Sequence, residues 1–312
     1  MIKYQGVTIY PLKPIIRYLS YLMIFYLFYS LPFSFKSFLR VYGFLIGVQF
    51  VVAIFEFVVL NDDRPNGTLQ NNNHIMYVLA VFFGINLFFH KRKLTSMLLA
   101  AFAAFLRGLG GIVTITSMFA SFLFLGRSKL ISKIGYLALA GLIVPVLLVV
   151  YSERIQENSD IFEVENRIEN EIPGGGGSLV WRIVTWVRHV EYVNSKNASF
   201  FGLGIDTSSS VSPYSTPVSA LDPHGDYIML YIDYGLFGLA MYVIGLTSVI
   251  FLFYRKYGKT KNHRYLAVTL IGIGLFCGHI VGNLLTQSTL WWMLAGQLGI
   301  FLREDKTKIE TA

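Results

Sequence analysis

The sequence predicts an all-α, polytopic integral membrane protein, and three observations lead to this fold class. Hydrophobic residues make up 54% of the 312 residues and charged residues only 14%, whereas a soluble domain carries roughly 25% charged residues. The mean hydropathy is +0.55. Apolar stretches of about twenty residues recur along the chain, and this length spans the bilayer core as a helix. The stretches do not alternate between apolar and polar residues, which excludes a transmembrane β-barrel.

Basic clusters between the apolar stretches set the order of the predicted spans. They occur at 91–93, 127–133 and 255–264 and again from residue 303, and the positive-inside rule places them on the cytoplasmic side. The same alternation places residues 1–16 outside, so either the first span is re-entrant or a further helix precedes this chain. About nine transmembrane helices are predicted, over residues 17–35, 41–60, 74–90, 94–106, 109–125, 134–151, 224–253, 265–285 and 287–302.

The chain therefore divides into N-terminal transmembrane helices (1–151), one long extracytoplasmic loop (152–223), and C-terminal transmembrane helices with a cytoplasmic tail (224–312). Loops longer than about 15 residues are usually functional or disordered. The first part of this loop is rich in acidic residues, and four glycines follow at 174–177. No Lys-Ser/Thr pair follows these glycines as in a phosphate-binding P-loop, so a flexible linker is favoured.

After the glycines, a helix is predicted from about Leu179 to Val193, with Ser178 as its cap. A helical period puts Arg182, Trp186 and His189 on one stripe, and Trp181, Val184 and Arg188 on another. A helix that carries tryptophan and arginine beside a membrane is ordinarily interfacial. Anchoring to lipid headgroups is therefore the alternative to a role of these arginines in substrate binding.

The stretch "ALDPHGDYIMLYIDYGLFGL" (220–239) begins a long apolar run with a histidine between two acids. Asp222 is a good N-cap and Pro223 suits the first helical position, so His224 is expected in the first turn. The helix dipole favours a neutral ring there, and a neutral histidine can take a proton from a hydroxyl. An interfacial histidine is one alternative. Metal binding through Asp222, His224 and Asp226 is another, but alternate positions of a helical turn point in different directions.

Further polar groups lie within or beside the predicted spans. Asp233 is expected inside the membrane, where a charge must pair, be protonated or face a polar cavity; tyrosines of its own helix or a basic residue are its expected partners. His279, Asn283 and Gln287 repeat at i, i+4 and i+8 and predict one polar helix face, which interhelical hydrogen bonding could also explain. Two arginines are expected near the outer surface, namely Arg64 and Arg107.

Three stretches of the chain resemble a known family. They are "DRPNGTLQNNNHIMYVLAVFFGI", "VWRIVTWVRHVEYVNSKNASFFGLGIDT" and "DPHGDYIMLYIDYGLFGLAMYVIGL". Their order and spacing are similar to those of the O-antigen polymerase and O-antigen ligase superfamily of bacterial integral-membrane glycosyltransferases, over roughly residues 40–302. Two positions depart from the family pattern. Gly225 stands where asparagine is frequent, and Leu106 precedes Arg107 where serine is usual.

The resemblance implies a metal-independent transfer of a glycan from undecaprenyl diphosphate to a hydroxyl at the outer face of the bacterial plasma membrane, with no cofactor. His224 would be the general base, and Arg182 would neutralise the diphosphate bidentately. The other implied substrate-binding residues are Arg64, Arg107, Arg188, Asp226, Tyr227 and Asp233. The implied partners are the lipid-linked oligosaccharide, the lipid bilayer, and flippase and chain-length regulator proteins.

The leading interpretation is a polysaccharide polymerase that joins repeat units for capsule, exopolysaccharide or O-antigen. A ligase that passes the finished glycan to a different lipid or protein acceptor is the nearest alternative, because both enzymes use one donor class and one chemistry. A glycolipid transporter or flippase is an alternative of another class, although the two related halves usual in transporters are not evident. Nucleic-acid binding is not expected, because the basic patches are short loops between spans.

Overall fold

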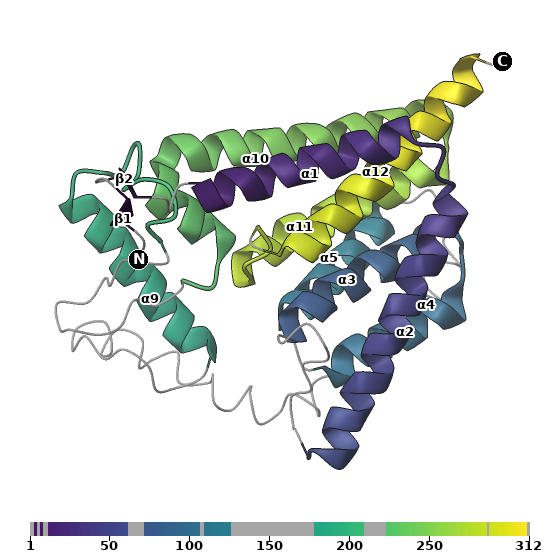
Figure 1. Ribbon diagram of the computed structural model, residues 1–312, viewed down its shortest axis with the longest axis horizontal. Coiled ribbons are helices and arrows are strands. Elements are labelled where there is room, and N and C mark those ends of the chain that lie inside the picture. Colours follow the sequence, from purple (N-terminus) through teal and green to yellow (C-terminus); the bar gives the residue numbers. More distant parts are fainter. Residues whose placement is uncertain are drawn as a thin grey trace. The chain divides into compact units, whose positions relative to one another are not determined.

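The structure, a computed structural model, describes residues 3–4, 7–8, 12–61, 72–106, 109–125, 178–208, 223–285 and 287–310. This part of the chain is helical apart from short connections and a two-stranded antiparallel ribbon of β1 (Lys3–Tyr4) and β2 (Val7–Thr8) (Figure 1). The helical class predicted from the sequence is confirmed. The predicted span 134–151, the acidic part of the long loop and the glycines at 174–177 lie outside the described residues.

Helices lie at each predicted span that falls within the described residues. The first begins earlier than expected, at Leu12 rather than near residue 17, and the second begins at Phe35, where the Ser34 hydroxyl accepts a hydrogen bond from the Ser37 N–H at 3.1 Å. The helices are α1 (Leu12–Ser30), α2 (Phe35–Val59), α3 (Asn72–Gly84) with the π-helical turn η2 (Ile85–Phe89), α4 (Lys93–Phe105), α5 (Leu109–Leu125), α9 (Ser178–Ser195), α10 (Asp226–Thr260), α11 (His263–Val281) and α12 (Ser288–Glu310).

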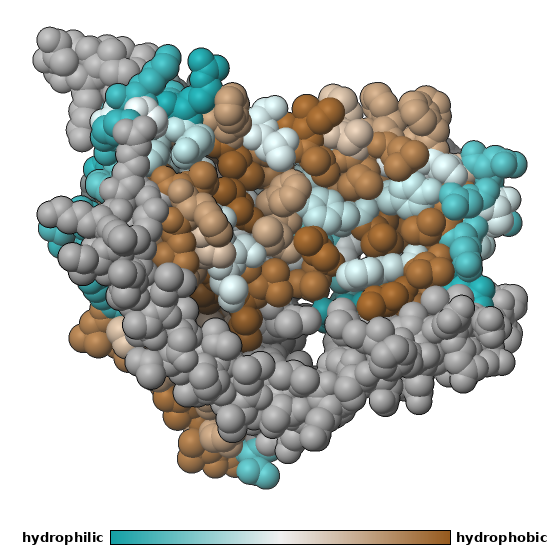
Figure 2. All heavy atoms as spheres, turned by 180° about the vertical axis from the view of Figure 1, so that it is seen from behind, coloured by the Kyte–Doolittle hydropathy of each residue, from teal (hydrophilic) through white to brown (hydrophobic). Residues whose placement is uncertain are grey.

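Three of these helices, α2, α10 and α11, are long and apolar enough to cross a membrane. Shorter apolar helices occur in α1, α3 with η2, α4 and α5. Hydrophobic side chains lie exposed over much of the described surface seen in Figure 2, as expected where lipid rather than water is the solvent. The helices are thus compatible with a membrane protein, while the number of spans stays a prediction.

The chain forms two compact units. In the first unit, α1 packs along α12 (Figure 1). The two helices approach closely at Gly299, since an added Cβ atom there would lie only 2.5 Å from the Phe25 carbonyl oxygen. Tyr21 stacks on Trp291, with ring centroids 6.0 Å apart, and the Trp291 indole N–H donates to the Leu284 carbonyl at 2.8 Å. Fully buried side chains of α3, among them Met76 and Tyr77, belong to the core of this unit.

The second unit contains α9, α10 and α11 together with most of α5. Helices α10 and α11 pack against each other and are joined by a tight turn, in which Lys261 has φ 54° and the Asn262 side chain accepts from the Arg264 N–H at 3.0 Å. Helix α5 approaches α11 at Gly274, where an added Cβ would lie 2.8 Å from the Thr114 carbonyl oxygen. The candidate site residues that the structure describes all belong to this unit.

Candidate functional site

The residues around His224 do not form the helical turn expected from the sequence. Helix α10 begins at Asp226, with Gly225 as its N-cap at φ −166° and ψ 119°. His224 precedes it with φ 46°, in the left-handed region, and its side chain is half-buried. The prediction of a helix start at Pro223 is therefore wrong, because a left-handed residue followed by an extended one cannot continue a helix. The dipole argument for a neutral His224 ring loses its basis, because His224 is not in the first turn.

Gly225 marks a close approach of three chain segments. A Cβ atom at this position would lie 3.1 Å from the Ile280 carbonyl oxygen and 3.2 Å from the Trp186 ring. A side chain here would require one of these neighbours to move. The glycine at this position thus has a packing explanation within this chain.

Helix α9 contacts both segments beside the start of α10 through side chains one turn apart. Arg182 Nη1 donates to the Val281 carbonyl oxygen at 3.1 Å, and Trp186 Nε1 donates to the Pro223 carbonyl oxygen at 2.5 Å. His189 continues the same stripe, is fully buried, and its Nδ1 lies 2.7 Å from the Thr185 carbonyl oxygen. The predicted stripe is confirmed, and it faces protein. Pure headgroup anchoring does not explain Arg182, because its guanidinium reaches the carbonyl that ends α11.

Arg188 lies on the other stripe of α9. Its Nη1 forms an ion pair with Glu191 Oε2 at 3.0 Å, and the glutamate side chain is exposed. Exposed pairs at this spacing contribute little to stability. The structure does not bring Arg188 to the face that carries Arg182. The other two predicted arginines, Arg64 and Arg107, and the predicted cap Asp222 lie outside the described residues.

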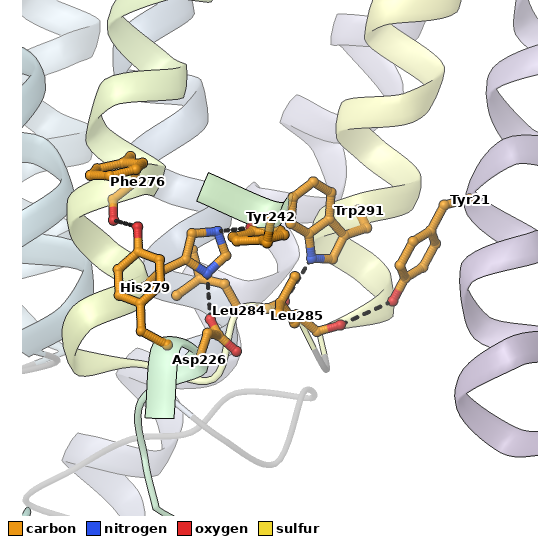
Figure 3. Close-up of polar contacts among 9 residues, drawn as sticks. Tyr21, Asp226, Tyr242, Phe276, His279, Leu284, Leu285 and Trp291 are labelled. Carbon is orange, nitrogen blue, oxygen red and sulfur yellow. Dashed lines mark hydrogen bonds and ion pairs between the residues drawn. The ribbon is translucent and has the colours of Figure 1, made fainter. Parts of the chain in front are cut away.

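A buried polar network joins the start of α10 to the end of α11 (Figure 3). His279 Nδ1 lies 2.5 Å from Asp226 Oδ2, and both side chains have 0% exposure. On its other side, His279 Nε2 lies 2.8 Å from the hydroxyl of Tyr242. In the neutral tautomer with the proton on Nδ1, the imidazole donates to the carboxylate and accepts from the tyrosine, so the three groups are matched. The backbone N–H of Asp226 also donates to the Gly282 carbonyl at 3.2 Å.

This network was not predicted, although two of its members were singled out. His279 was expected on one helix face with Asn283 and Gln287. That prediction is wrong because α11 ends at Val281, so the i, i+4, i+8 spacing does not continue along a helix. A usable signal was present, since an acid and a histidine in neighbouring apolar helices each need a polar partner.

Tyr227 and Asp233, two further predicted substrate-binding residues, have structural partners. The Tyr227 hydroxyl donates to the Phe276 carbonyl at 2.7 Å. Asp233 is buried and accepts from the Ser208 N–H at 2.8 Å, the Thr207 hydroxyl at 3.2 Å and the Asp206 N–H at 3.3 Å. The partners expected for Asp233, tyrosines or a basic residue, are thus replaced by donors of a short segment after α9.

Metal ligands are sparse in the part of the chain that the structure describes. No group of three or more His, Cys, Asp or Glu side chains there could hold a metal ion. Of the residues considered as ligands from the sequence, Asp226 has its carboxylate directed to His279. Among the described residues, no third side chain therefore completes a metal site with His224 and Asp226.

Comparison with known proteins adds no family to these observations. The chain matches no family model and no curated protein sequence. The described residues define a helical protein with helices long enough to cross a membrane. In it, α9, which carries Arg182, contacts both the residue before His224 and the end of α11. The buried Asp226–His279 pair joins the same two elements, α10 and α11. The resemblance of the three stretches stays a prediction.

Proposed function

We propose that this chain is a polysaccharide polymerase of the bacterial plasma membrane. It transfers an undecaprenyl-diphosphate-linked glycan to a sugar hydroxyl of another repeat unit at the outer face. The observation that carries the proposal is the docking of α9 on the residue next to His224 and on the end of α11, since Trp186 bonds to Pro223 and Arg182 bonds to Val281. Two of the resembling stretches, distant in sequence, thus supply a cation and a histidine to one region.

The chemistry requires one base and at least one cation. The oxygen of the acceptor hydroxyl forms a bond to the anomeric carbon, while the bond between that carbon and the diphosphate oxygen breaks. The electron pair leaves with undecaprenyl diphosphate, and the hydroxyl proton passes to the imidazole of His224. Arg182 pairs with the diphosphate, whose charge grows as it departs, through the planar fork of its guanidinium. A single displacement of this kind inverts the anomeric centre.

The buried network has a positioning role in this proposal. His224 lies two residues before Asp226, and its backbone is in the sparsely populated left-handed region. The contacts of Asp226 with His279 and Gly282 fix where α10 starts. A base must lie within hydrogen-bond reach of the proton that it removes, so a fixed helix start supports a fixed base.

The membrane arrangement is proposed from the sequence. The proposed chain crosses the membrane about nine times, with the loop 152–223 outside and the tail inside. The lipid-linked oligosaccharide enters laterally from the bilayer, and flippase and chain-length regulator proteins supply the substrate and limit the product. The proposal requires residues near Gly175 and near Gly258 to be labelled from opposite sides of the membrane.

The proposal is tested by complementing a strain that lacks this gene and displaying its glycans as a ladder. We expect Arg182→Lys to insert normally and to lose most polymer, because lysine supplies the charge without the planar fork. His224→Gln is expected to lose general-base assistance, at a cost of about 10²–10⁴-fold in rate. Arg255→Lys is the matched control, since Arg255 is exposed near the end of α10, stacked over Phe251.

The deletion strain separates the related functions. A polymerase deletion leaves single repeat units on the lipid carrier. Long chains retained on that carrier would indicate a ligase, and units trapped inside the cell would indicate a flippase. Near-normal ladders from both Arg182→Lys and His224→Gln would refute the proposed site.

A further inference from the structure

Helix α10 is broken at Gly235, which has φ 66° and ψ −165° within an otherwise helical stretch. In an unbroken helix the N–H of Leu236 would donate to the Ile232 carbonyl, and the N–H of Phe237 would donate to the Asp233 carbonyl. The break separates these four groups. They belong to a helix that is apolar enough to cross a membrane, where an unpaired backbone group is costly.

The segment 199–204, which follows α9, pairs with all four groups. The N–H groups of Leu236 and Phe237 donate to the carbonyls of Ser199 and Phe200, at 2.8 and 3.0 Å. In return the N–H groups of Leu203 and Gly204 donate to the carbonyls of Ile232 and Asp233, at 2.8 and 3.1 Å. Two intrahelical hydrogen bonds are thus replaced by four between the segment and the helix.

Glycines make this approach possible on both sides. A Cβ atom at Gly235 would collide with the Phe200 carbonyl, and one at Gly202 would collide with the Tyr234 backbone nitrogen. Both residues also have positive φ, 66° and 78°. Directly after this segment, the N–H groups of Asp206 and Ser208 and the hydroxyl of Thr207 donate to the Asp233 carboxylate. The polar groups of the break are therefore paired within the protein.

Three phenylalanines, called the aromatic tip below, project from the paired segment and the helix. Phe200, Phe201 and Phe237 are exposed by 57%, 71% and 52%. Their rings contact one another, with centroids 4.7 Å apart for Phe200 and Phe201, and 6.1 Å from each of these to Phe237. Phe237 is continued along α10, at i+4 and i+7, by the exposed Met241 and Ile244. The aromatic tip thus extends one apolar face of a membrane-length helix.

We propose that residues 199–204 lie in the bilayer and that the aromatic tip contacts the acyl chains beside α10. The sequence alone places these residues in the extracytoplasmic loop 152–223. Non-helical backbone at membrane depth is costly when its polar groups are unpaired, and the four hydrogen bonds to α10 pair the carbonyls of Ser199 and Phe200 and the N–H groups of Leu203 and Gly204. The bilayer is the inferred partner because the aromatic tip is continuous with the exposed apolar face of α10. This inference does not depend on the glycosyltransferase proposal.

Spin labels on single cysteines test the inference in the full chain, reconstituted in phosphatidylcholine–phosphatidylglycerol vesicles. The native Cys277 is first replaced by alanine. Phe201→Cys carries the test label, Ile244→Cys is the lipid reference, and Lys196→Cys, an exposed polar position close in sequence, is the water reference. Collisions with oxygen, which concentrates in lipid, are compared with collisions with a water-soluble nickel chelate.

We expect the label at position 201 to collide more with oxygen than with the nickel chelate, as at position 244, with the opposite order at position 196. A label at position 201 that behaves like the one at position 196 would overturn the inference. Protection from both reagents would also overturn it, because a protein partner would then cover the aromatic tip. Phe200→Cys repeats the measurement at a second exposed position, in case the first variant fails to fold.

Discussion

Replacing His279 by leucine tests the buried network of α10 and α11 most directly. The substitution removes the imidazole that lies 2.5 Å from Asp226 and 2.8 Å from the Tyr242 hydroxyl. Because Asp226 has 0% exposure, water cannot readily replace the lost partner. Removing the partner of a buried charge typically costs about 3–5 kcal/mol, because the remaining carboxylate is left uncompensated. We therefore expect thermal unfolding to occur lower by on the order of 10 °C.

The measurement is thermal unfolding of the purified protein in lipid nanodiscs, followed by tryptophan fluorescence. Tyr242→Phe serves as the graded comparison, since it removes one hydroxyl from the network and should cost only about 1 kcal/mol. The double variant Asp226→Asn with His279→Leu should be more stable than His279→Leu alone, because the amide carries no charge. If His279→Leu cost no more than Tyr242→Phe, the reasoning from a buried carboxylate that needs its partner would be refuted.

Two further substitutions test single contacts. Gly235→Ala should destabilise the protein by about 1–3 kcal/mol, because its φ of 66° and the contact with the Phe200 carbonyl both exclude a Cβ; Gly245→Ala, with nothing within 4 Å, should be neutral or stabilising in the same unfolding assay. Trp186→Phe keeps an aromatic ring but removes the donor to Pro223, and the glycan ladder should show partial loss of polymer. Trp292→Phe, which loses only its bond to the Ser20 hydroxyl, should leave the ladder near normal, and equal ladders from both variants would contradict the role of Trp186.

The helices were predictable because the signals for them are local. Continuous apolar runs located the described helices, and the helical period in α9 placed Arg182 and Trp186 on one stripe. These signals depend on residues a few positions apart. The start of α10 was mispredicted for the same reason. Pro223 is a good first helical residue in isolation, whereas the close approach of Ile280 and Trp186 to Gly225 depends on distant segments.

The partners of buried polar groups were not predictable from one sequence. Asp226 and His279 are separated by 53 positions, and no local pattern connects them. The hydrogen bond between Asp233 and Thr207 likewise joins residues far apart in the sequence, 26 positions in this case. In both cases the sequence indicates that a buried acid requires a partner, but the fold determines which partner is near.

The exchange of hydrogen bonds at Gly235 makes the bend of α10 a property of the assembled protein rather than of the helix itself. Without residues 199–204, intrahelical bonds from Leu236 and Phe237 to Ile232 and Asp233 would restore pairing of the same four groups. A straight α10 and a bent one are thus alternative ways of pairing one set of groups. Because 199–204 precedes α10 in the chain, the segment is already synthesised when the helix forms. The bend of α10 and the docking of 199–204 are therefore one event, since neither set of hydrogen bonds exists without the other.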